Sequence, residues 1–116
     1  DGGGLRELMR HARDGGVMAV LLDQYTKRGV EIDFLGRPAP SGTMIAELAR
    51  KYDVPMIPVY GTRSADGVHV TVEFEAPIPP GTAEEMTQAA AHSLAARVLA
   101  RPEQYFWLHR RWVKRF

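Results

Sequence analysis

The feature that most constrains the fold is a run of six apolar residues, VMAVLL, at positions 17–22, followed directly by Asp23. Apolar side chains at every position, rather than at alternate positions, are typical of a strand covered on both faces. A helix is predicted just before it, over residues 5–13, with apolar residues at helical spacing, and Gly15 and Gly16 are expected to end it. The start of the chain therefore predicts a helix that leads into a doubly buried strand.

The rest of the chain alternates between strand and helix patterns. Strands are predicted over residues 30–35, 56–60 and 69–74, and helices over residues 43–51 and 83–100, with a final helix opened by Pro102. Residues 36–40 are expected to form a turn, with Ser41 and Thr82 as helix N-caps. Inward-facing side chains are expected at alternate strand positions: Val30, Ile32, Phe34, Val70, Val72 and Phe74. This alternation predicts an α/β domain with a mixed β-sheet flanked by helices.

Length and composition exclude several classes of protein. A chain of 116 residues is at most one domain, and its net charge of +1 gives no global field that would attract nucleic acid. The absence of cysteine excludes disulfides, thiolate metal sites and a cysteine nucleophile. The longest apolar run is far too short to span a bilayer, and the four histidines are not spaced for a metal, so no metal and no cofactor are expected.

Asp23 is the strongest single candidate for a functional residue. It is expected at the carboxyl end of the most buried strand, which is where open α/β sheets place their sites. A carboxylate in that position can orient a catalytic histidine or bind a substrate hydroxyl. The alternative is a strand-end aspartate that accepts backbone N–H groups and has only a structural role.

The end of the chain mixes aromatic and cationic residues in an unusual density. Arginine forks bind phosphate or carboxylate oxygens two at a time, so this stretch predicts an anionic partner. The alternative is a solvated face with a few aromatic rings turned inward. His109 is open between a substrate contact and local support. The residues of the stretch are Tyr105, Phe106, Trp107, His109, Arg110, Arg111, Trp112, Lys114 and Arg115.

The same stretch, PEQYFWLHRRW at residues 102–112, resembles the C-terminal end of the bacterial lipid A biosynthesis acyltransferases. The resemblance continues upstream through VMAVLLDQ at 17–24, EIDFLG at 31–36, the turn at 41–43 and VPMIPVY at 54–60. These enzymes are the lauroyl and myristoyl transferases, which place secondary acyl chains on lipid A precursors. The resemblance implies a partial glycerolipid-acyltransferase-like domain.

The resemblance also implies site residues and partners. Asp23 matches the family's acidic residue near the active site, where we expect a supporting catalytic role. Gln24, His109, Arg110 and Arg111 are expected to bind substrate. The implied partners are an acyl carrier protein thioester, a lipid A precursor and a membrane surface, at the cytoplasmic face of the bacterial inner membrane, with no nucleic acid.

One family motif is absent from this sequence. The family uses a histidine followed by four residues and then Asp or Glu, in which the histidine is the general base. The residues five positions after each histidine are Gly16, Phe74, Arg97 and Lys114, none of them acidic. We therefore expect residues 1–116 to be the C-terminal portion of one acyltransferase domain, inactive alone and prone to self-association, with the catalytic histidine and membrane anchor upstream.

Two other functions remain open at this stage. One is a non-catalytic α/β module that binds an anionic partner, nucleic acid or a membrane surface, through the aromatic and basic C-terminus. The other is a domain without a ligand whose C-terminus is simply solvated. A histidine–carboxylate motif upstream in the parent reading frame would favour the enzyme.

Overall fold

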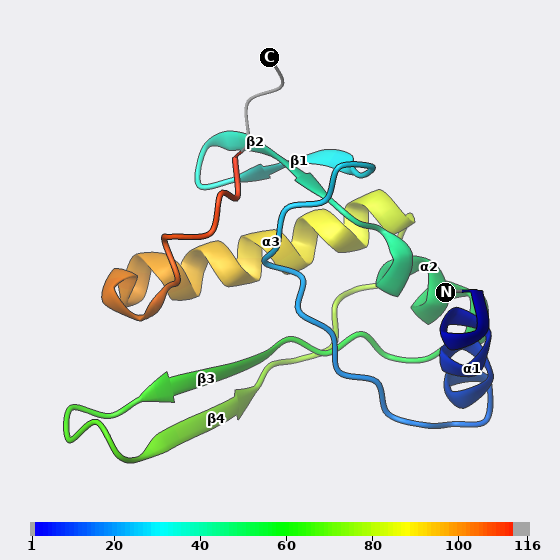
Figure 1. Ribbon diagram of the computed structural model, residues 1–116, viewed down its shortest axis with the longest axis horizontal. Coiled ribbons are helices and arrows are strands. Elements are labelled where there is room, and N and C mark those ends of the chain that lie inside the picture. The colour runs from blue at the N-terminus through cyan, green and yellow to red at the C-terminus, as the bar shows by residue number, and fades with distance from the viewer. Residues whose placement is uncertain (1, 113–116) are drawn as a thin grey trace.

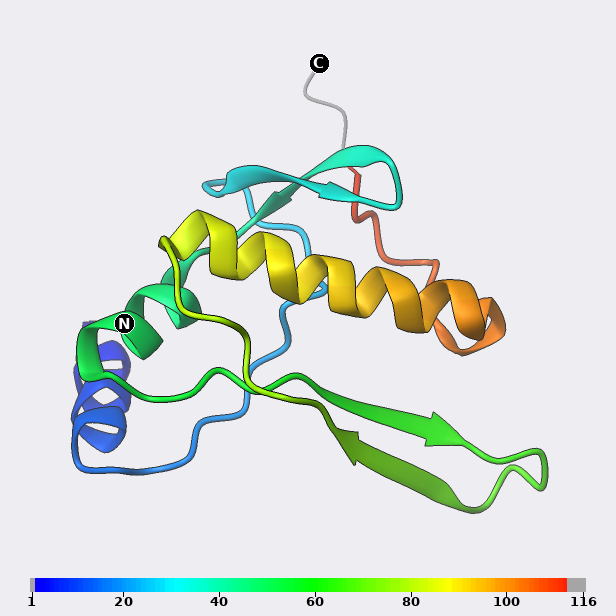
Figure 2. The ribbon, with the colours of Figure 1, turned by 180° about the vertical axis from the view of Figure 1, so that it is seen from behind.

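The computed structural model describes residues 2–112, and the long helix α3 (Ala83–Ala100) lies at its centre. The hairpin of β1 (Val30–Phe34) and β2 (Arg37–Ser41) covers one side of α3, and the hairpin of β3 (Val59–Arg63) and β4 (Val70–Phe74) lies on the other (Figures 1 and 2). Helices α1 (Gly2–Arg13) and α2 (Met44–Tyr52) lie together beside the start of α3. After α3, the short 3-10 helix η1 (Pro102–Gln104) turns the chain back toward β1 and β2.

The α/β class expected from the sequence is confirmed, but the strands are arranged differently. The described strands form two separate antiparallel pairs rather than one mixed sheet. Within the described residues, no helix is both long and apolar enough to cross a membrane. Lys114 and Arg115, which the sequence assigned to the basic C-terminus, lie outside the described residues.

The β1–β2 hairpin follows its sequence pattern on β1. Ile32 and Phe34 are buried, while the alternate residues Glu31 and Asp33 face solvent. The turn predicted over residues 36–40 is confirmed at Gly36 but wrong beyond it, because Arg37–Ser41 form β2. Pro38 and Pro40 occupy alternate positions of β2, at which the backbone nitrogen points away from β1. Proline has no N–H, but at these positions no hydrogen bond between the two strands is lost.

The core consists of two small clusters on opposite parts of α3. The first joins β1 and β2 to α3 and contains Ile32, Phe34, Ala39, Ala91 and Val98. The second joins α2 to the start of α3 and contains Ala46, Ala49, Met56 and Met86. The buried residues of α3 are Met86, Thr87, Ala91 and Val98, so the helix contributes to both clusters.

Helices α2 and α3 begin or end at capping residues that lie next to them in the sequence. Thr82 and Glu85 form the predicted N-terminal cap of α3 reciprocally, with N···O distances of 3.1 and 2.8 Å. Asp53 ends α2 in the left-handed conformation, with φ of 51°. Ser41 was predicted to cap α2, but this is wrong: it is the last residue of β2, and Thr43 holds the N-cap position.

The predicted strand at residues 17–22 does not form in the described structure. The segment is extended but has no ladder partner, and Val17 and Leu21 are 90% and 76% exposed. A strand requires a neighbour for its backbone N–H and C=O groups, and the described residues supply none here. The apolar pattern therefore identifies a segment suited to burial on both faces, which the described structure leaves mostly uncovered, although Leu22 packs against the cluster of α2 and α3.

The β3–β4 hairpin projects away from the rest of the molecule (Figure 1). Val70, Val72 and Phe74 share one face as predicted, but that face is exposed rather than inward, because no layer within residues 2–112 covers it. The radius of gyration is 15.1 Å, compared with about 13 Å for a compact domain of this length. The projecting hairpin accounts for the difference in shape.

An ion-pair network fastens the base of this hairpin to α3. The Arg97 guanidinium bonds Glu73 at 2.7 Å and Glu75 at 2.8 Å, and lies 4.9 Å from the centre of the Tyr60 ring. Ser93 donates a hydrogen bond to Glu75 at 2.5 Å and contacts the Tyr60 hydroxyl at 2.7 Å. These bonds lower the pKa of the Glu75 carboxyl, those from Ser93 and Arg97 most, while burial raises the pKa of Tyr60.

Candidate functional site

The candidate site is built by the C-terminal segment, defined here as residues 105–112. The final helix predicted from Pro102 is wrong beyond η1, because the chain continues as successive tight turns. Backbone bonds between residues close in sequence, from Trp107 to Tyr105 and from Arg111 to His109, keep the segment compact. The segment can therefore place several side chains against distant parts of the chain.

Aromatic rings hold this segment against β1. Phe34, which is fully buried, has ring-centre distances of 5.9 Å to Tyr105 and 5.4 Å to Trp112. Trp107 adds contacts of 4.9 Å to Tyr105 and 6.4 Å to Trp112, and the Trp112 indole donates to the Phe34 carbonyl at 3.2 Å. Most of the aromatic residues in this segment therefore have a structural role rather than a ligand-binding role.

Arg111 is the most buried charged residue of the segment, with 2% of its surface exposed. Its guanidinium donates to the Pro40 carbonyl at 2.6 Å and to the Ser41 hydroxyl, and its carbon Cζ lies 5.6 Å from the centre of the Phe34 ring. Both terminal nitrogens are thus bonded inside the chain. The substrate-binding role predicted for Arg111 stays a prediction, and its position favours structural support.

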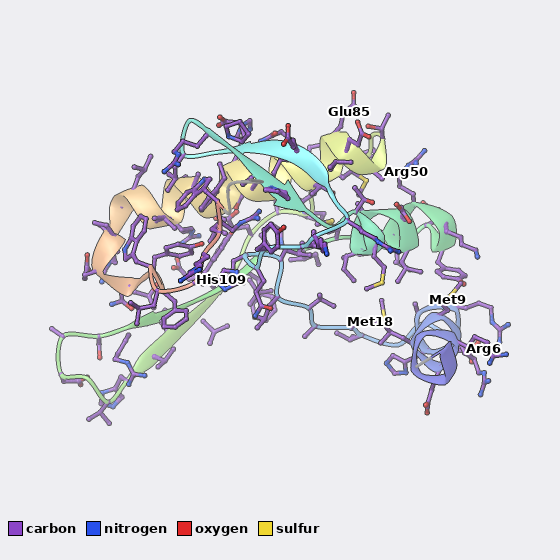
Figure 3. The ribbon with its side chains drawn as sticks, turned by 45° about the horizontal axis from the view of Figure 1, so that its top comes forward. Arg6, Met9, Met18, Arg50, Glu85 and His109 are labelled. Atoms are coloured by element: carbon purple, nitrogen blue, oxygen red, sulfur yellow. The ribbon has the colours of Figure 1, made fainter. Side chains whose placement is uncertain are left out.

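The side chain of His109 joins the C-terminal segment to the chain that leads into β1 (Figure 3). Its Nε2 accepts a hydrogen bond from the backbone N–H of Tyr25 at 2.8 Å, across 84 residues of sequence. Since Nε2 is the acceptor, the proton of the neutral ring is on Nδ1. Of the two roles that the sequence left open for His109, this bond favours local support. A substrate contact would have to use the other ring nitrogen, Nδ1.

Asp23 lies in the same region and is partly buried. Its Oδ1 is buried without a hydrogen-bond partner in the described part of the chain, and the same holds for the Tyr105 hydroxyl and the Arg111 Nε. The three groups act on one another electrostatically: burial raises the pKa of Tyr105 and the Asp23 charge raises it further, whereas burial lowers the pKa of Arg111 against the opposing effect of Tyr105 and Asp23. A carboxylate so placed can bind one further donor, such as an imidazole or a hydroxyl.

The structure thus brings together three of the five predicted site residues, Asp23, His109 and Arg111. The other two, Gln24 and Arg110, are exposed beside them, so their side chains are available to a ligand. Sequence reasoning assigned no role to Tyr25 or Tyr105. For Tyr105 the only available signal was its place in the aromatic stretch, and for Tyr25 its closeness to Asp23.

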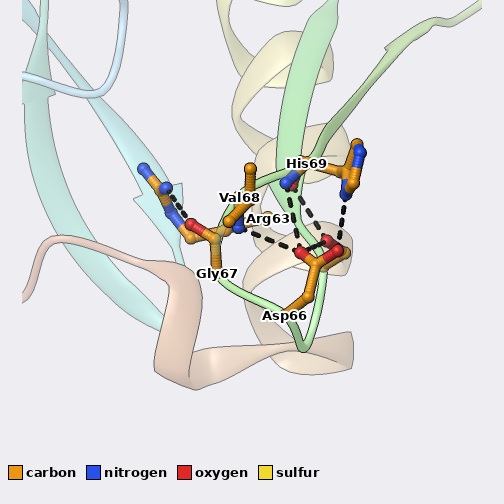
Figure 4. A network of polar contacts seen from close by, with 6 residues as sticks. Arg63, Asp66, Gly67, Val68 and His69 are labelled. Atoms are coloured by element: carbon orange, nitrogen blue, oxygen red, sulfur yellow. Dashed lines mark hydrogen bonds and ion pairs between the residues drawn. The ribbon is translucent and has the colours of Figure 1, made fainter.

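A histidine–carboxylate pair occurs at the tip of the β3–β4 hairpin, away from Asp23 and His109 (Figure 4). His69 Nδ1 lies 2.5 Å from Asp66, whose carboxylate also accepts the Ser64 hydroxyl and the backbone N–H of Val68. These hydrogen bonds, that of Ser64 first, hold the pKa of Asp66 far below its usual range. The pair is exposed and closes a turn, which is a structural role.

In the described residues, no group of three or more His, Asp or Glu side chains is placed to hold a metal ion.

Comparison with protein families matches this chain to the bacterial lipid A biosynthesis acyltransferases over residues 1–114. The match extends over almost the whole chain, including the segments that carry Asp23 and His109. A search of curated proteins finds no match. The family match agrees with the resemblance seen in the sequence and supports an acyltransferase lineage.

Proposed function

Since the chain belongs to the bacterial lipid A biosynthesis acyltransferase family, we propose that it is the C-terminal portion of an enzyme that acylates a lipid A precursor. The donor is an acyl carrier protein thioester carrying a lauroyl or myristoyl chain, and the acceptor is a hydroxyl of the precursor. The reaction takes place at the cytoplasmic face of the inner membrane. The observation that carries the proposal is the family match over residues 1–114.

In the proposed reaction, some catalytic groups come from this chain and others come from the upstream part of the enzyme. A histidine outside this chain takes the proton of the acceptor hydroxyl, and the oxygen attacks the thioester carbonyl. The C–S bond then breaks, and the departing thiolate takes the proton back from the imidazolium. The ester and the free carrier thiol are the products, so that atoms and charges balance.

In this scheme Asp23 supports the reaction rather than starting it. Its partly buried carboxylate, with one oxygen unpaired among the described residues, is suited to receive the N–H of the catalytic imidazole or to hold the acceptor hydroxyl. The exposed side chains of Gln24 and Arg110 contact the phosphorylated acceptor, and Arg110 supplies the charge-assisted hydrogen bond.

The proposal is tested with the full-length protein that contains this chain. Purified enzyme is incubated with lauroyl or myristoyl acyl carrier protein and a phosphorylated lipid A precursor, and the product is followed by mass spectrometry. We expect the precursor to gain one acyl chain, and we expect a dephosphorylated precursor to be a poorer acceptor. Transfer from the carrier to an unrelated alcohol, with none to the precursor, would contradict the proposed acceptor.

A further inference from the structure

We propose that the C-terminal segment is a clamp that fixes the position of Asp23 and Gln24, with His109 and Arg111 as its positioning residues. The inference rests on the proposed function, because it takes Asp23 to belong to the active site. It assigns the basic residues of the segment two different tasks: Arg110 faces solvent, whereas His109 and Arg111 hold the chain that carries Asp23.

The first point of attachment is the bond from Tyr25 to His109. Tyr25 follows Asp23 by two residues, and its backbone N–H is 2.8 Å from the His109 Nε2. Residues 18–29 have no helix or strand of their own in the described structure, so this bond is a principal attachment of the stretch. Loss of this acceptor would free the backbone next to Asp23, because no ladder or turn replaces it.

The second point of attachment is reached through Ser41. Arg111 bonds the Pro40 carbonyl and the Ser41 hydroxyl, and so fixes the end of β2. Gly29 lies against that end so closely that a Cβ at this position would be 2.2 Å from the Ser41 carbonyl oxygen. The segment from residue 23 to residue 29 is therefore held near its start by His109 and at its end by the strand that Arg111 holds.

Electrostatics favours the same arrangement. The positive charge of Arg111 acts on the Asp23 carboxylate, and the Tyr105 hydroxyl lies in the field of both groups. The two terminal nitrogens of Arg111 are hydrogen-bonded to β2. In the described structure the charge of Arg111 therefore attracts Asp23 without a direct hydrogen bond between them. Positioning of this kind matters because small displacements of a catalytic group lower the reaction rate sharply.

The first test uses the full-length protein and follows hydrogen exchange of the peptides around Tyr25 by mass spectrometry. His109→Gln retains an acceptor near the position of Nε2, whereas His109→Asn is too short to reach Tyr25. We expect exchange near the wild-type rate in the Gln variant and about fivefold faster exchange in the Asn variant, since such a bond contributes about 1 kcal/mol. Leu108→Ala, at an exposed neighbouring residue, is the matched control, and the amides of α3 report whether each variant is folded.

The second test measures kinetics in the full-length enzyme. A positioning role predicts that His109→Asn and Arg111→Lys lower kcat by between about tenfold and 100-fold with an unchanged KM for the acceptor, and that His109→Gln restores most of the rate. A raised KM with an unchanged kcat would overturn the clamp and make His109 a substrate contact. Equal Tyr25 exchange in all variants would also overturn it. If the wild-type enzyme transfers no acyl chain, the proposed function fails, and the Tyr25 exchange alone decides whether the clamp exists.

Discussion

At the scale of single residues, neighbours in sequence take opposite roles. Arg110 and Arg111 are adjacent, yet the first is exposed and the second is 2% exposed. The burial of Arg111 follows from contacts with β2 and Phe34, residues 70 or more positions away, which no local pattern could show.

The two arginines are therefore expected to respond differently to substitution. Arg110→Ala in the full-length enzyme should raise KM for the phosphorylated acceptor and leave the unfolding free energy unchanged, since exposed arginine pairs contribute little to stability. Arg111→Ala should lower the unfolding free energy by about 3 kcal/mol, because it leaves buried oxygens of Pro40 and Ser41 without their donor. Urea denaturation and acceptor titration at several salt concentrations measure both effects. An unchanged KM for Arg110→Ala across the salt series would show that Arg110 is only solvated.

Asp23 provides the second prediction at this scale. Asp23→Asn retains the size of the side chain and removes its charge, so the full-length enzyme should lose at least about 100-fold in kcat with little change in melting temperature. Gln24→Glu is a useful companion, because it adds a negative charge beside the same site and should weaken binding of the phosphorylated acceptor. A fall in melting temperature with a normal rate per folded molecule would instead make Asp23 structural.

At the scale of elements, local chemistry predicts those parts of the fold that are stabilised locally. The capped helix α3, the helix α2 ended at Asp53 and the alternating strand β1 all follow from the sequence. The segment at residues 17–22 and the inward face of β4 do not, because their predicted burial needs a covering layer that the described residues do not supply. The site was predictable in composition but not in arrangement, since its defining bond joins Tyr25 to His109 across 84 residues.

The attachment of the β3–β4 hairpin to α3 should depend on pH. The pKa of Glu75 is lowered from its ordinary 4.5, so the stability that it contributes is fully present above that pH and is lost as the pH falls through the lowered folded-state pKa. Glu75→Gln should therefore lower the melting temperature by a few degrees at pH 7 and have a smaller effect at pH 3. Glu31→Gln, at an exposed carboxylate on β1, is the control. An equal effect of Glu75→Gln at both pH values would contradict the ion-pair account.

At the scale of the whole molecule, the described residues leave apolar side chains uncovered, and two stretches of them stand out. One is the segment at residues 17–22, and the other is the outer face of the β3–β4 hairpin, where Val70, Val72 and Phe74 are 52%, 56% and 73% exposed. Exposed apolar patches of this kind mark a surface that another part of a protein covers. Both places agree with the proposal that this chain is one portion of a larger domain.

The isolated chain should therefore associate with itself at micromolar concentration. Val72→Lys with Phe74→Lys should shift the population toward monomer, because the charges oppose burial of the hairpin face. Thr71→Lys, on the opposite face of the same strand, is the matched control. Sedimentation velocity measures the populations, and a strictly monomeric wild-type chain that binds no hydrophobic dye would contradict the prediction.

The central claim is that this chain supplies Asp23 and its clamp to an acyltransferase whose general base lies elsewhere in the protein. The most direct measurement is acyl transfer from acyl carrier protein to a phosphorylated lipid A precursor, followed by mass spectrometry for the isolated chain and the full-length protein at equal concentration. The account predicts turnover by the full-length protein and none above background by the isolated chain, since a positioned base contributes about 10²–10⁴-fold. Clear turnover by the isolated chain would contradict it, because residues 1–116 would then contain the base.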